Sequence, residues 1–212
     1  MNFTDWSTII NTMTKNMTKQ LIMEAAFELF YTRSYTAVGV QEICQKAGVK
    51  KGSFYHFFAS KQALMIDVLD MSWQRFYEGV IKPTLASHQP PLTCIAQFLS
   101  YNHQHQCNIK ETEGIIKGCP YGNLASELST QDDVIRQHVK QLFSRVVTSL
   151  DKCLQRAVAE GELDENLNTQ QWAKYILAQI EGSILLAKVH NDLQYVENLS
   201  TLLLSTLKAS RS

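Results

Sequence analysis

Residues 39–58 read GVQEICQKAGVKKGSFYHFF, which has the pattern of two short helices joined by a tight turn. We predict the first helix from about Val40 to Ala47, with Gly48 ending it as glycines at the C′ position do. The chain then turns at Val49–Lys51, and a second short helix is predicted from Gly52 to Phe58. A turn this tight fixes the angle between the two helices.

The start of the second helix carries side chains that suit contact with DNA. Lys50 and Lys51 supply positive charge for phosphates. The hydroxyls of Ser53 and Tyr55 and the ring of His56 can reach phosphates or base edges. A DNA-reading helix-turn-helix presents such an N-terminal end to the major groove. On spacing alone, a helical hairpin that only packs, with solvated lysines, is an equally good interpretation.

The flanking sequence extends this pair of helices in both directions. From Thr18 to about Arg33, apolar residues recur three or four positions apart, as on one face of an amphipathic helix: Leu21, Ile22, Ala25, Ala26, Leu29 and Phe30. The first dozen residues are expected to form a loose arm. Ser60 is a good N-cap for a long helix from Lys61 to about Leu85, closed by Pro83 and Pro90-Pro91.

The remainder of the chain is also predicted to be helical. We place helices at about 91–108, 119–129, 131–160, 168–189 and 192–208, with breaks at Gly114, Gly118 and the stretch 161–168. No segment sustains the alternation of a strand, so no sheet is expected. The sequence therefore predicts an all-α fold, with an N-terminal arm and three-helix helix-turn-helix domain at residues 1–60 and a helical bundle at residues 61–212.

The composition describes a globular chain that can bury a core. Hydrophobic residues make up 45% of the 212, with 9 Gly and 4 Pro. No apolar run approaches the roughly 18 residues that span a membrane, and the start of the chain lacks the features of a signal peptide. Five cysteines without a CxxC pair argue for reduced thiols in the cytoplasm and against a zinc site or disulfide framework.

Charge is distributed unevenly along a chain whose net charge is zero. Residues 1–61 carry seven Lys or Arg and four acids, whereas the remainder carries 13 Lys or Arg and 16 acids. An N-terminal part with a positive net charge, followed by a part with a negative net charge, suits a protein that contacts phosphate only through its N-terminal part.

The sequence around the helix pair resembles the signature of the TetR/AcrR family of repressors. The matching positions are Ala25-Ala26, Leu29-Phe30, Tyr35-Thr36, Val40, Ile43, the run 47–58, Ser60-Lys61 and Leu64. The resemblance implies nine or ten helices, three of them in the DNA-binding domain. It also implies that the helix from Lys61 links this domain to a ligand-binding and dimerisation domain.

The resemblance further implies which residues contact DNA. Tyr55 and His56 would contact the backbone and bases, and Lys61 would clamp a phosphate at a helix N-terminus, where the helix dipole favours anions. The full expected set is Lys19, Gln41, Lys50, Lys51, Gly52, Ser53, Tyr55, His56 and Lys61. Many relatives have Thr or Ser where this chain has Val38 and Gly39, so only backbone N–H groups remain for contact there.

Residues 118–128 read GCPYGNLASEL, which is similar to a segment in a subgroup that includes N-ethylmaleimide-responsive and small unsaturated-acid-responsive repressors. This similarity implies that Cys119 is a sensing thiol. The chemistry is compatible, because Pro120 fits a first helical position and a helix N-terminus favours the thiolate. The alternative is a well-packed helix start in which Cys119 is a small buried hydrophobe.

A ligand site is expected around the helix at 91–108, since the resemblance implies that such a helix lines the pocket with aromatic walls and a few polar groups. The expected ligand-binding residues are Phe98, Tyr101, Asn102, His105, Cys119, Tyr121, Asn123, Glu127, Trp172, Tyr175 and Gln179. His103, His105 and Cys107 do not all share a helix face, so neither a metal nor another cofactor is expected.

The last two predicted helices carry apolar side chains on two faces, which suggests a partner for one of them. The resemblance implies a four-helix interface between two subunits. We assign this interface to Ile176, Ile180, Ile184, Leu199, Leu203 and Leu207. The second face adds Leu177, Leu185, Leu186 and Leu202. A purely internal core is the alternative interpretation of these residues.

These observations favour a homodimeric transcriptional repressor, not an enzyme, that binds a near-palindromic operator and releases it on binding a small molecule, with an electrophile among the candidates. An enzyme is disfavoured because the chain lacks a Gly-rich phosphate loop, a nucleophile elbow and a metal-ligand cluster. A catalytic pair of Cys119 with His103 or His105 stays open. A third alternative is an architectural or activating DNA-binding protein with a purely structural second domain.

Overall fold

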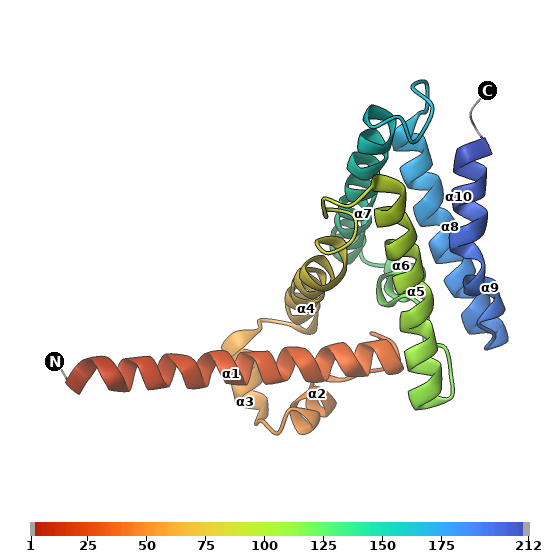
Figure 1. The fold of residues 1–212 in the computed structure, drawn as a ribbon. Helices are drawn as coiled ribbons and strands as arrows, with labels where there is room; N and C mark the ends of the chain where they lie inside the picture. Colours follow the sequence, from red (N-terminus) through yellow and green to blue (C-terminus); the bar gives the residue numbers. More distant parts are fainter. Residues whose placement is uncertain (1–2, 210–212) are drawn as a thin grey trace.

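The computed structural model describes residues 3–209, and Figure 1 shows helices from end to end. Within this range no strand occurs, so the expected all-α fold is confirmed. The elements in chain order are α1 (Phe3–Thr32), α2 (Val40–Lys46), α3 (Lys51–Phe57), α4 (Lys61–Phe76), the π-helix η1 (Tyr77–Ile81), α5 (Pro91–Glu113), α6 (Pro120–Leu128), α7 (Asp133–Ala159), α8 (Thr169–His190), α9 (Gln194–Glu197) and α10 (Leu199–Ala209).

Several helices begin and end at the residues that the sequence indicates. The hydroxyl of Ser60 accepts a hydrogen bond from the Ala63 N–H at 3.0 Å and so caps α4. Asp132 caps α7 in the same way, at 3.0 Å from the Ile135 N–H. Gly48 ends α2 with a φ of +67°, a conformation that glycine adopts without strain.

Four predicted boundaries were wrong. The helix from Lys61 ends at Phe76, where the π-helix η1 follows, and not at about Leu85. α1 begins at Phe3, not near Thr18, because no Gly or Pro interrupts the chain before Gly39; residues 1–2 of the expected loose arm lie outside the described range. α5 continues to Glu113, where Gly114 ends it with a φ of +75°. The predicted helix at 192–208 is two helices, which meet at Asn198.

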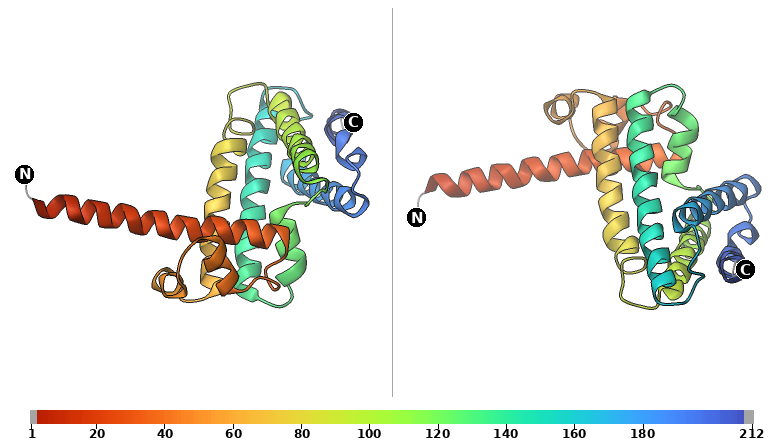
Figure 2. Two further views of the ribbon diagram at one scale, coloured as in Figure 1. Left: turned by 90° about the horizontal axis from the view of Figure 1, so that it is seen from below. Right: turned by 90° about the horizontal axis from the view of Figure 1, so that it is seen from above.

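The described chain has two hydrophobic cores that share the long helices. One lies among α1, α2, α3 and the first half of α4, and it continues into α6 and the first half of α7 through Tyr121, Leu124, Leu128, Ile135 and Val139. The other fills the bundle of α5, α7, α8, α9 and α10. Figure 2 shows α4 and α7 side by side between these two parts. The α1–α3 unit therefore packs directly on α6 and α7.

None of the described helices is both long and apolar enough to cross a membrane.

Candidate nucleic-acid interface and ligand pocket

α3 buries one side and presents the other to solvent. Phe54 is fully buried, and its ring packs against that of Phe58. Tyr55, in contrast, is 54% exposed, with the ammonium group of Lys51 6.0 Å from its ring centre. Lys50 and His56 are exposed as well. The structure thus brings the expected DNA-reading side chains together on one free surface.

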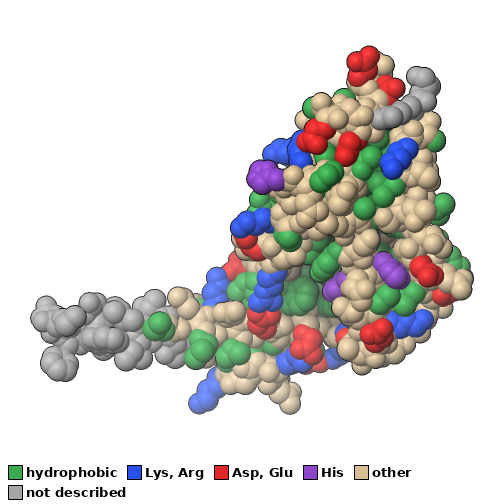
Figure 3. Space-filling view, in the orientation of Figure 1, with side chains coloured by type: hydrophobic (Ala, Val, Ile, Leu, Met, Phe, Trp, Pro, Cys, Tyr) green, Lys and Arg blue, Asp and Glu red, His purple; other side chains and the backbone are tan. Residues whose placement is uncertain are grey.

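A shallow hollow beside α3 adds residues that the sequence analysis missed. Lys15 and Thr18 of α1 line it together with Gly52, Ser53 and His56. These two residues were missed because the segment before Thr18 was predicted to be an arm and not a helix. Figure 3 shows Lys and Arg side chains projecting from this underside of the molecule, with Asp and Glu side chains among them and a further group of acids at the opposite end.

The ammonium group of Lys61, which is expected to bind a DNA phosphate, has hydrogen-bond partners within the chain. Its ammonium group donates hydrogen bonds to the carbonyl oxygens of Tyr35 and Val38, both at 3.0 Å, and lies 4.2 Å from the Tyr35 ring centre. Burial lowers the pKa of Lys61, although nearby Glu127 opposes that shift. Lys61 therefore holds the loop between α1 and α2. This contact helps to orient helices α1–α3, which we call the reading head.

Two further members of the expected DNA-contact set differ in their surroundings. Lys19 pairs with Asp67 at 2.7 Å and lies 5.5 Å from the Phe58 ring centre, which ties α1 to α4. Gln41 is exposed on α2. The side chain of Val38 is fully buried and has no surface with which to contact DNA. This position is one at which many relatives have Thr or Ser.

A cavity of about 270 Å³ lies where α4, α5, α6, α7 and α8 meet. Six of the expected ligand-binding residues line it: Phe98, Tyr101, Asn102, His105, Cys119 and Tyr121. Further lining residues include Phe27, Ser72, Arg75, Phe76, Gln106, Phe143 and Glu181. The cavity combines aromatic walls with a few polar groups, as small-molecule sites do.

The polar groups of this cavity are largely neutral. Burial lowers the pKa of His105, whose ring stacks on Tyr101 with centres 5.8 Å apart. Burial raises the pKa of Tyr121 to about 12, and its hydroxyl lies 3.0 Å from that of Ser72. His105 is thus an uncharged imidazole at neutral pH, and Tyr121 is an uncharged phenol.

Cys119 has the expected position but not the expected chemistry. It is the N-cap of α6, and its sulfur accepts a hydrogen bond from the Gly122 N–H at 3.5 Å. Burial, and then the neighbouring Glu181 carboxylate, raise the pKa of the Cys119 thiol well above its usual range. The helix N-terminus does not overcome these two effects, so the surroundings favour the thiol over the expected thiolate, and the sensing role of Cys119 stays a prediction.

Glu181 is a functional candidate that the sequence analysis missed. Its carboxyl group lies against the first turn of α6, where a side chain on Gly122 would place Cβ 2.3 Å from a Glu181 oxygen. Burial raises the pKa of this carboxyl group. The available signal was an acid on the same helix face as Leu177, Ile180 and Ile184, which is an unusual place for a charge.

Five expected ligand residues lie away from the cavity. Trp172, Tyr175 and Gln179 fall on the side of α8 opposite its lining residues, because successive helical positions rotate by about 100°. Asn123 is engaged elsewhere, since its side chain accepts a hydrogen bond from Lys188 at 2.8 Å. Glu127, the fifth, faces the reading head instead. The structure therefore does not bring these five residues into the cavity with the other six.

Glu127 holds the loop that joins α1 to α2. Its carboxylate accepts hydrogen bonds from the N–H groups of Tyr35 and Thr36, at 3.0 and 2.8 Å, and from the Thr36 hydroxyl at 2.5 Å. Partial burial alone would raise the pKa of Glu127, but these hydrogen bonds outweigh it and lower the pKa. The C-terminal half of α6 is thus fastened to the head.

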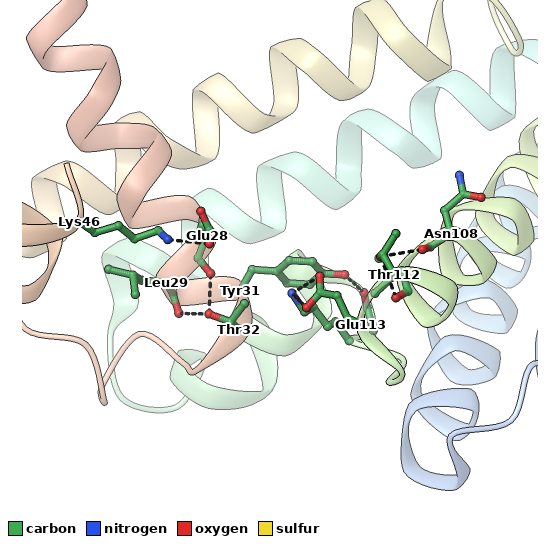
Figure 4. A network of polar contacts seen from close by, with 11 residues as sticks. Glu28, Leu29, Tyr31, Thr32, Lys46, Asn108, Thr112 and Glu113 are labelled. Atoms are coloured by element: carbon green, nitrogen blue, oxygen red, sulfur yellow. Dashed lines mark hydrogen bonds and ion pairs between the residues drawn. The ribbon is translucent and has the colours of Figure 1, made fainter. Parts of the chain in front are cut away.

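The loop that precedes α6 is also held to the head, through Gly118. The Tyr31 hydroxyl donates to the Gly118 carbonyl oxygen at 2.7 Å. Figure 4 shows Tyr31 reaching from α1 towards the end of α5, beside Glu113. The nearly buried Lys117 pairs with Glu113 and lies 5.5 Å from the Tyr31 ring centre. α6 and its preceding loop therefore contact both the cavity and α1.

The alternative metal site finds no support in the geometry. Among residues 3–209, no three His, Cys, Asp or Glu side chains gather as ligands would. Cys107 lies 3.3 Å from His103, but His105 stacks on Tyr101 inside the cavity.

Comparison with known proteins agrees with this architecture. The model of "Bacterial regulatory proteins, tetR family" matches residues 22–68, and that of "Tetracyclin repressor-like, C-terminal domain" matches residues 99–203. A relative from Lactococcus lactis, an HTH-type transcriptional regulator in the lacX 3′ region, is 32% identical over 85% of this chain and 88% of its own length. The chain belongs to the TetR family.

Two further TetR-family proteins resemble the whole chain. The repressor DhaR of Mycobacterium sp. strain GP1 is 26% identical over 93% of this chain and 96% of its own. The reduced form of NemR from Escherichia coli is 23% identical, with a TM-score of 0.75 over 88% of this chain and 95% of that one. Together with the family models, these relatives identify a transcriptional regulator and not an enzyme.

The residues expected at the subunit interface of this TetR-family chain are buried within the chain itself. The six expected residues are between 0 and 8% exposed and belong to the bundle's own core: Ile176, Ile180, Ile184, Leu199, Leu203 and Leu207. They have almost no surface left for a partner. The exposed apolar side chains are Leu185, Leu186 and Val189 on α8 and Leu202 on α10, between 46 and 69% exposed.

Proposed function

We propose that this TetR-family chain is a homodimeric repressor that binds a near-palindromic operator through α3 and releases it when a small molecule occupies the cavity. One observation carries the proposal: the short helix α6 contacts both the cavity and the loop that precedes the helix-turn-helix. The start of α6 supplies Cys119 and Tyr121 to the cavity wall. Near its other end, Glu127 holds the backbone of the α1–α2 loop.

Release follows if the occupied cavity prefers a different position of α6. A ligand between α5 and α8 presses on Cys119 and Tyr121, and α6 moves as a unit because it is one continuous helix. The bonds from Glu127 to Tyr35 and Thr36 then carry α1 and α2 with it. A ligand that binds better to this arrangement shifts the population away from the DNA-binding one.

The exposed apolar face of α8 and α10 supports a dimer. Leu185, Leu186, Val189 and Leu202 are exposed on α8 and α10, and Figure 1 places these two helices at the edge of the molecule. Pairing this face with a second copy removes it from water. A two-fold dimer presents two α3 helices, and half-sites are then expected about 34–36 Å apart or at multiples of that distance.

Reversible binding is favoured over covalent sensing. The protonated, buried thiol of Cys119 is a weak nucleophile, since only the thiolate attacks electrophiles. The cavity offers room and polar partners for a ligand that forms no bond to sulfur.

The test is an operator selected from genomic DNA by the purified protein, followed by fluorescence-anisotropy titration at fixed salt with scrambled competitor. Compounds that raise the Tm of the free protein are then added to the complex. We expect sequence-specific binding that at least one such compound weakens tenfold or more. Specific binding that no stabilising compound weakens would contradict ligand control, and no preference over competitor would contradict the repressor itself.

A further inference from the structure

Gln106, one of the residues that line the cavity, has a buried side-chain acceptor that lacks a hydrogen bond. The side chain of Gln106 is only 2% exposed, and its Nε2 donates to the Gly118 carbonyl oxygen at 3.5 Å. Its Oε1 has no partner among the described residues. Buried carbonyl oxygens are nearly always satisfied in folded proteins, so this atom is suited to receive a donor from a ligand.

A carboxyl group stands near the same Gly118-Cys119 segment. Glu181 neighbours the Cys119 thiol, and Gln106 bonds to Gly118, so the two side chains approach this segment from α8 and α5 respectively. The ion pairs found among the described residues do not include Glu181. This carboxyl group and the Gln106 oxygen are both acceptors that line one cavity.

The basic groups around this site are occupied or uncharged. On α4, Arg75 lines the cavity, but its guanidinium is held by Glu24, with one contact at 2.7 Å. On α5, burial keeps His105 neutral. On the far side of Glu181, Lys188 donates to Asn123 at 2.8 Å. The remaining titratable neighbours, Tyr101, Cys119 and Tyr121, are neutral, and α7 contributes only Phe143 and Val146.

The walls of the cavity favour a cation as well. Its aromatic lining comes from α1, α4, α5, α6 and α7: Phe27, Phe76, Phe98, Tyr101, Tyr121 and Phe143. The faces of such rings attract ammonium groups, and surfaces of this kind enclose amine ligands elsewhere. The volume equals that of about nine water molecules, which suits a body of one ring and not a large multi-ring molecule.

We propose that the cavity selects a small organic amine in its protonated form, with the ammonium group donating to Glu181 and to Gln106 Oε1 and the apolar body packed between the aromatic side chains. This assignment names the chemical class of the effector, and the effector role itself rests on the proposed function. Selectivity follows because a carboxylate ligand would meet Glu181 as a like charge, and a neutral alcohol would bring no opposite charge to the Glu181 carboxylate, which already has the Cys119 thiol as a hydrogen-bond partner.

Amine binding is expected to depend on pH in a definite direction. Burial raises the pKa of Glu181, so a proton competes with an amine for its carboxylate at higher pH than it would at an exposed glutamate. The ammonium ion needs the carboxylate, and binding to the neutral form must release a proton. Affinity for an amine should therefore rise as pH increases through the Glu181 pKa, whereas affinity for a neutral alcohol should not.

Three probes of one shape test the proposal: benzylamine, benzyl alcohol and benzoate, titrated calorimetrically into the full-length protein without DNA. We expect benzylamine to bind at least tenfold more tightly than the alcohol, and benzoate more weakly than either. In Glu181→Gln the amine preference should vanish while alcohol binding stays within about twofold. Glu165→Gln, an exposed acid between α7 and α8, is the matched control and should keep the preference.

A second variant guards against a folding defect in the first. Gln106→Leu removes the unpaired acceptor at similar volume and should weaken benzylamine severalfold, with a cooperative thermal transition retained. The proposal is overturned if benzoate or the alcohol binds as tightly as the amine, if Glu181→Gln keeps the amine preference, or if none of the three probes binds at millimolar concentration.

Adding the selected operator separates this proposal from the repressor function. Benzylamine that binds the cavity and releases the operator supports both. Benzylamine that binds with the expected Glu181 dependence but leaves the operator bound upholds the cavity's selectivity and contradicts ligand control by this class. Failure of all probes in a protein that still binds its operator contradicts only the amine assignment.

Discussion

The reading head and the cavity are built in opposite ways. The head carries its functional side chains on α3, a helix of seven residues, and leaves Tyr55 and His56 in solvent. The cavity gathers its lining from α1, α4, α5, α6, α7 and α8, and buries several of these residues, including Phe98, Tyr121 and Ile180. A change in the head should therefore alter DNA binding without altering stability, whereas a change in the cavity should alter both stability and the response to ligand.

The largest expected effect is on stability, in the cavity. Phe98 is 2% exposed and packs near Phe76, with ring centres 6.3 Å apart, so Phe98→Ala leaves a void in the bundle core. We expect a loss of about 3–5 kcal/mol in the free energy of unfolding, measured by denaturant titration. Operator affinity, measured below the transition, should change by less than about threefold. A loss below about 1 kcal/mol would contradict the packing described.

The next effect is on DNA binding, in the head. Because Tyr55 is half exposed and packs on no core residue but Phe54 at its edge, Tyr55→Ala should spare stability within about 0.5 kcal/mol. Operator affinity should fall by roughly 1–3 kcal/mol in anisotropy titrations. The control is Tyr195→Ala on α9, an exposed tyrosine far from α3 in the sequence. Equal operator affinity in the two variants would refute the assignment of α3.

Glu127→Ala tests the link between the two regions. It removes the acceptor of the Tyr35 and Thr36 N–H groups, so a bound ligand should release the operator severalfold less effectively while ligand affinity in the absence of DNA is unchanged. Anisotropy and calorimetry on the same protein measure the two quantities. Release as efficient as in the wild type would break the proposed connection through α6.

The same carboxylate gives the fold a defined acid sensitivity. The folded-state pKa of Glu127 is below its ordinary value of 4.5, so its stabilisation is fully present above that value and is lost as pH falls through the lowered pKa. In Glu127→Gln, the loss of stability that accompanies protonation of this carboxylate should disappear. Tm values measured between about pH 3 and 6 should then fall less steeply with decreasing pH than in the wild type. An unchanged curve would mean that the bonds to the head contribute nothing to stability.

The smallest effect is expected at Cys119. Cys119→Ser should leave operator affinity within about twofold and should not change the response to N-ethylmaleimide, because the thiol is protonated at neutral pH. Peptide mapping by mass spectrometry should show slow labelling of Cys119 that speeds up as pH is raised towards its elevated pKa. Fast labelling of Cys119 at pH 7 would contradict this prediction and support covalent sensing.

The head could be predicted because its information is local. The turn glycine Gly48, the cap Ser60 and the run around Tyr55 lie within a few residues of the structures that they determine. Even there, the contacts of Lys61 were not predicted, since its carbonyl partners at residues 35 and 38 come from a loop whose path the sequence does not specify.

The cavity and the exposed face of α8 could be predicted only in part. α8 is apolar on several sides, so periodicity alone did not distinguish buried Ile180 from exposed Leu185. Glu181 acquires its role only because α6 approaches closely at Gly122, a contact between positions 59 residues apart in the sequence. Helical spacing identified the α5 face correctly, because Tyr101 and His105 share one side of a single helix.

The measurement that tests the central claim most directly is ligand affinity with and without operator. A compound that raises the Tm of the protein is titrated calorimetrically into free protein and into the protein–operator complex. If α6 couples the two sites, the operator must weaken ligand binding by the same factor by which the ligand weakens operator binding, and we expect a factor of ten or more. Equal ligand affinity in the two titrations would contradict the account.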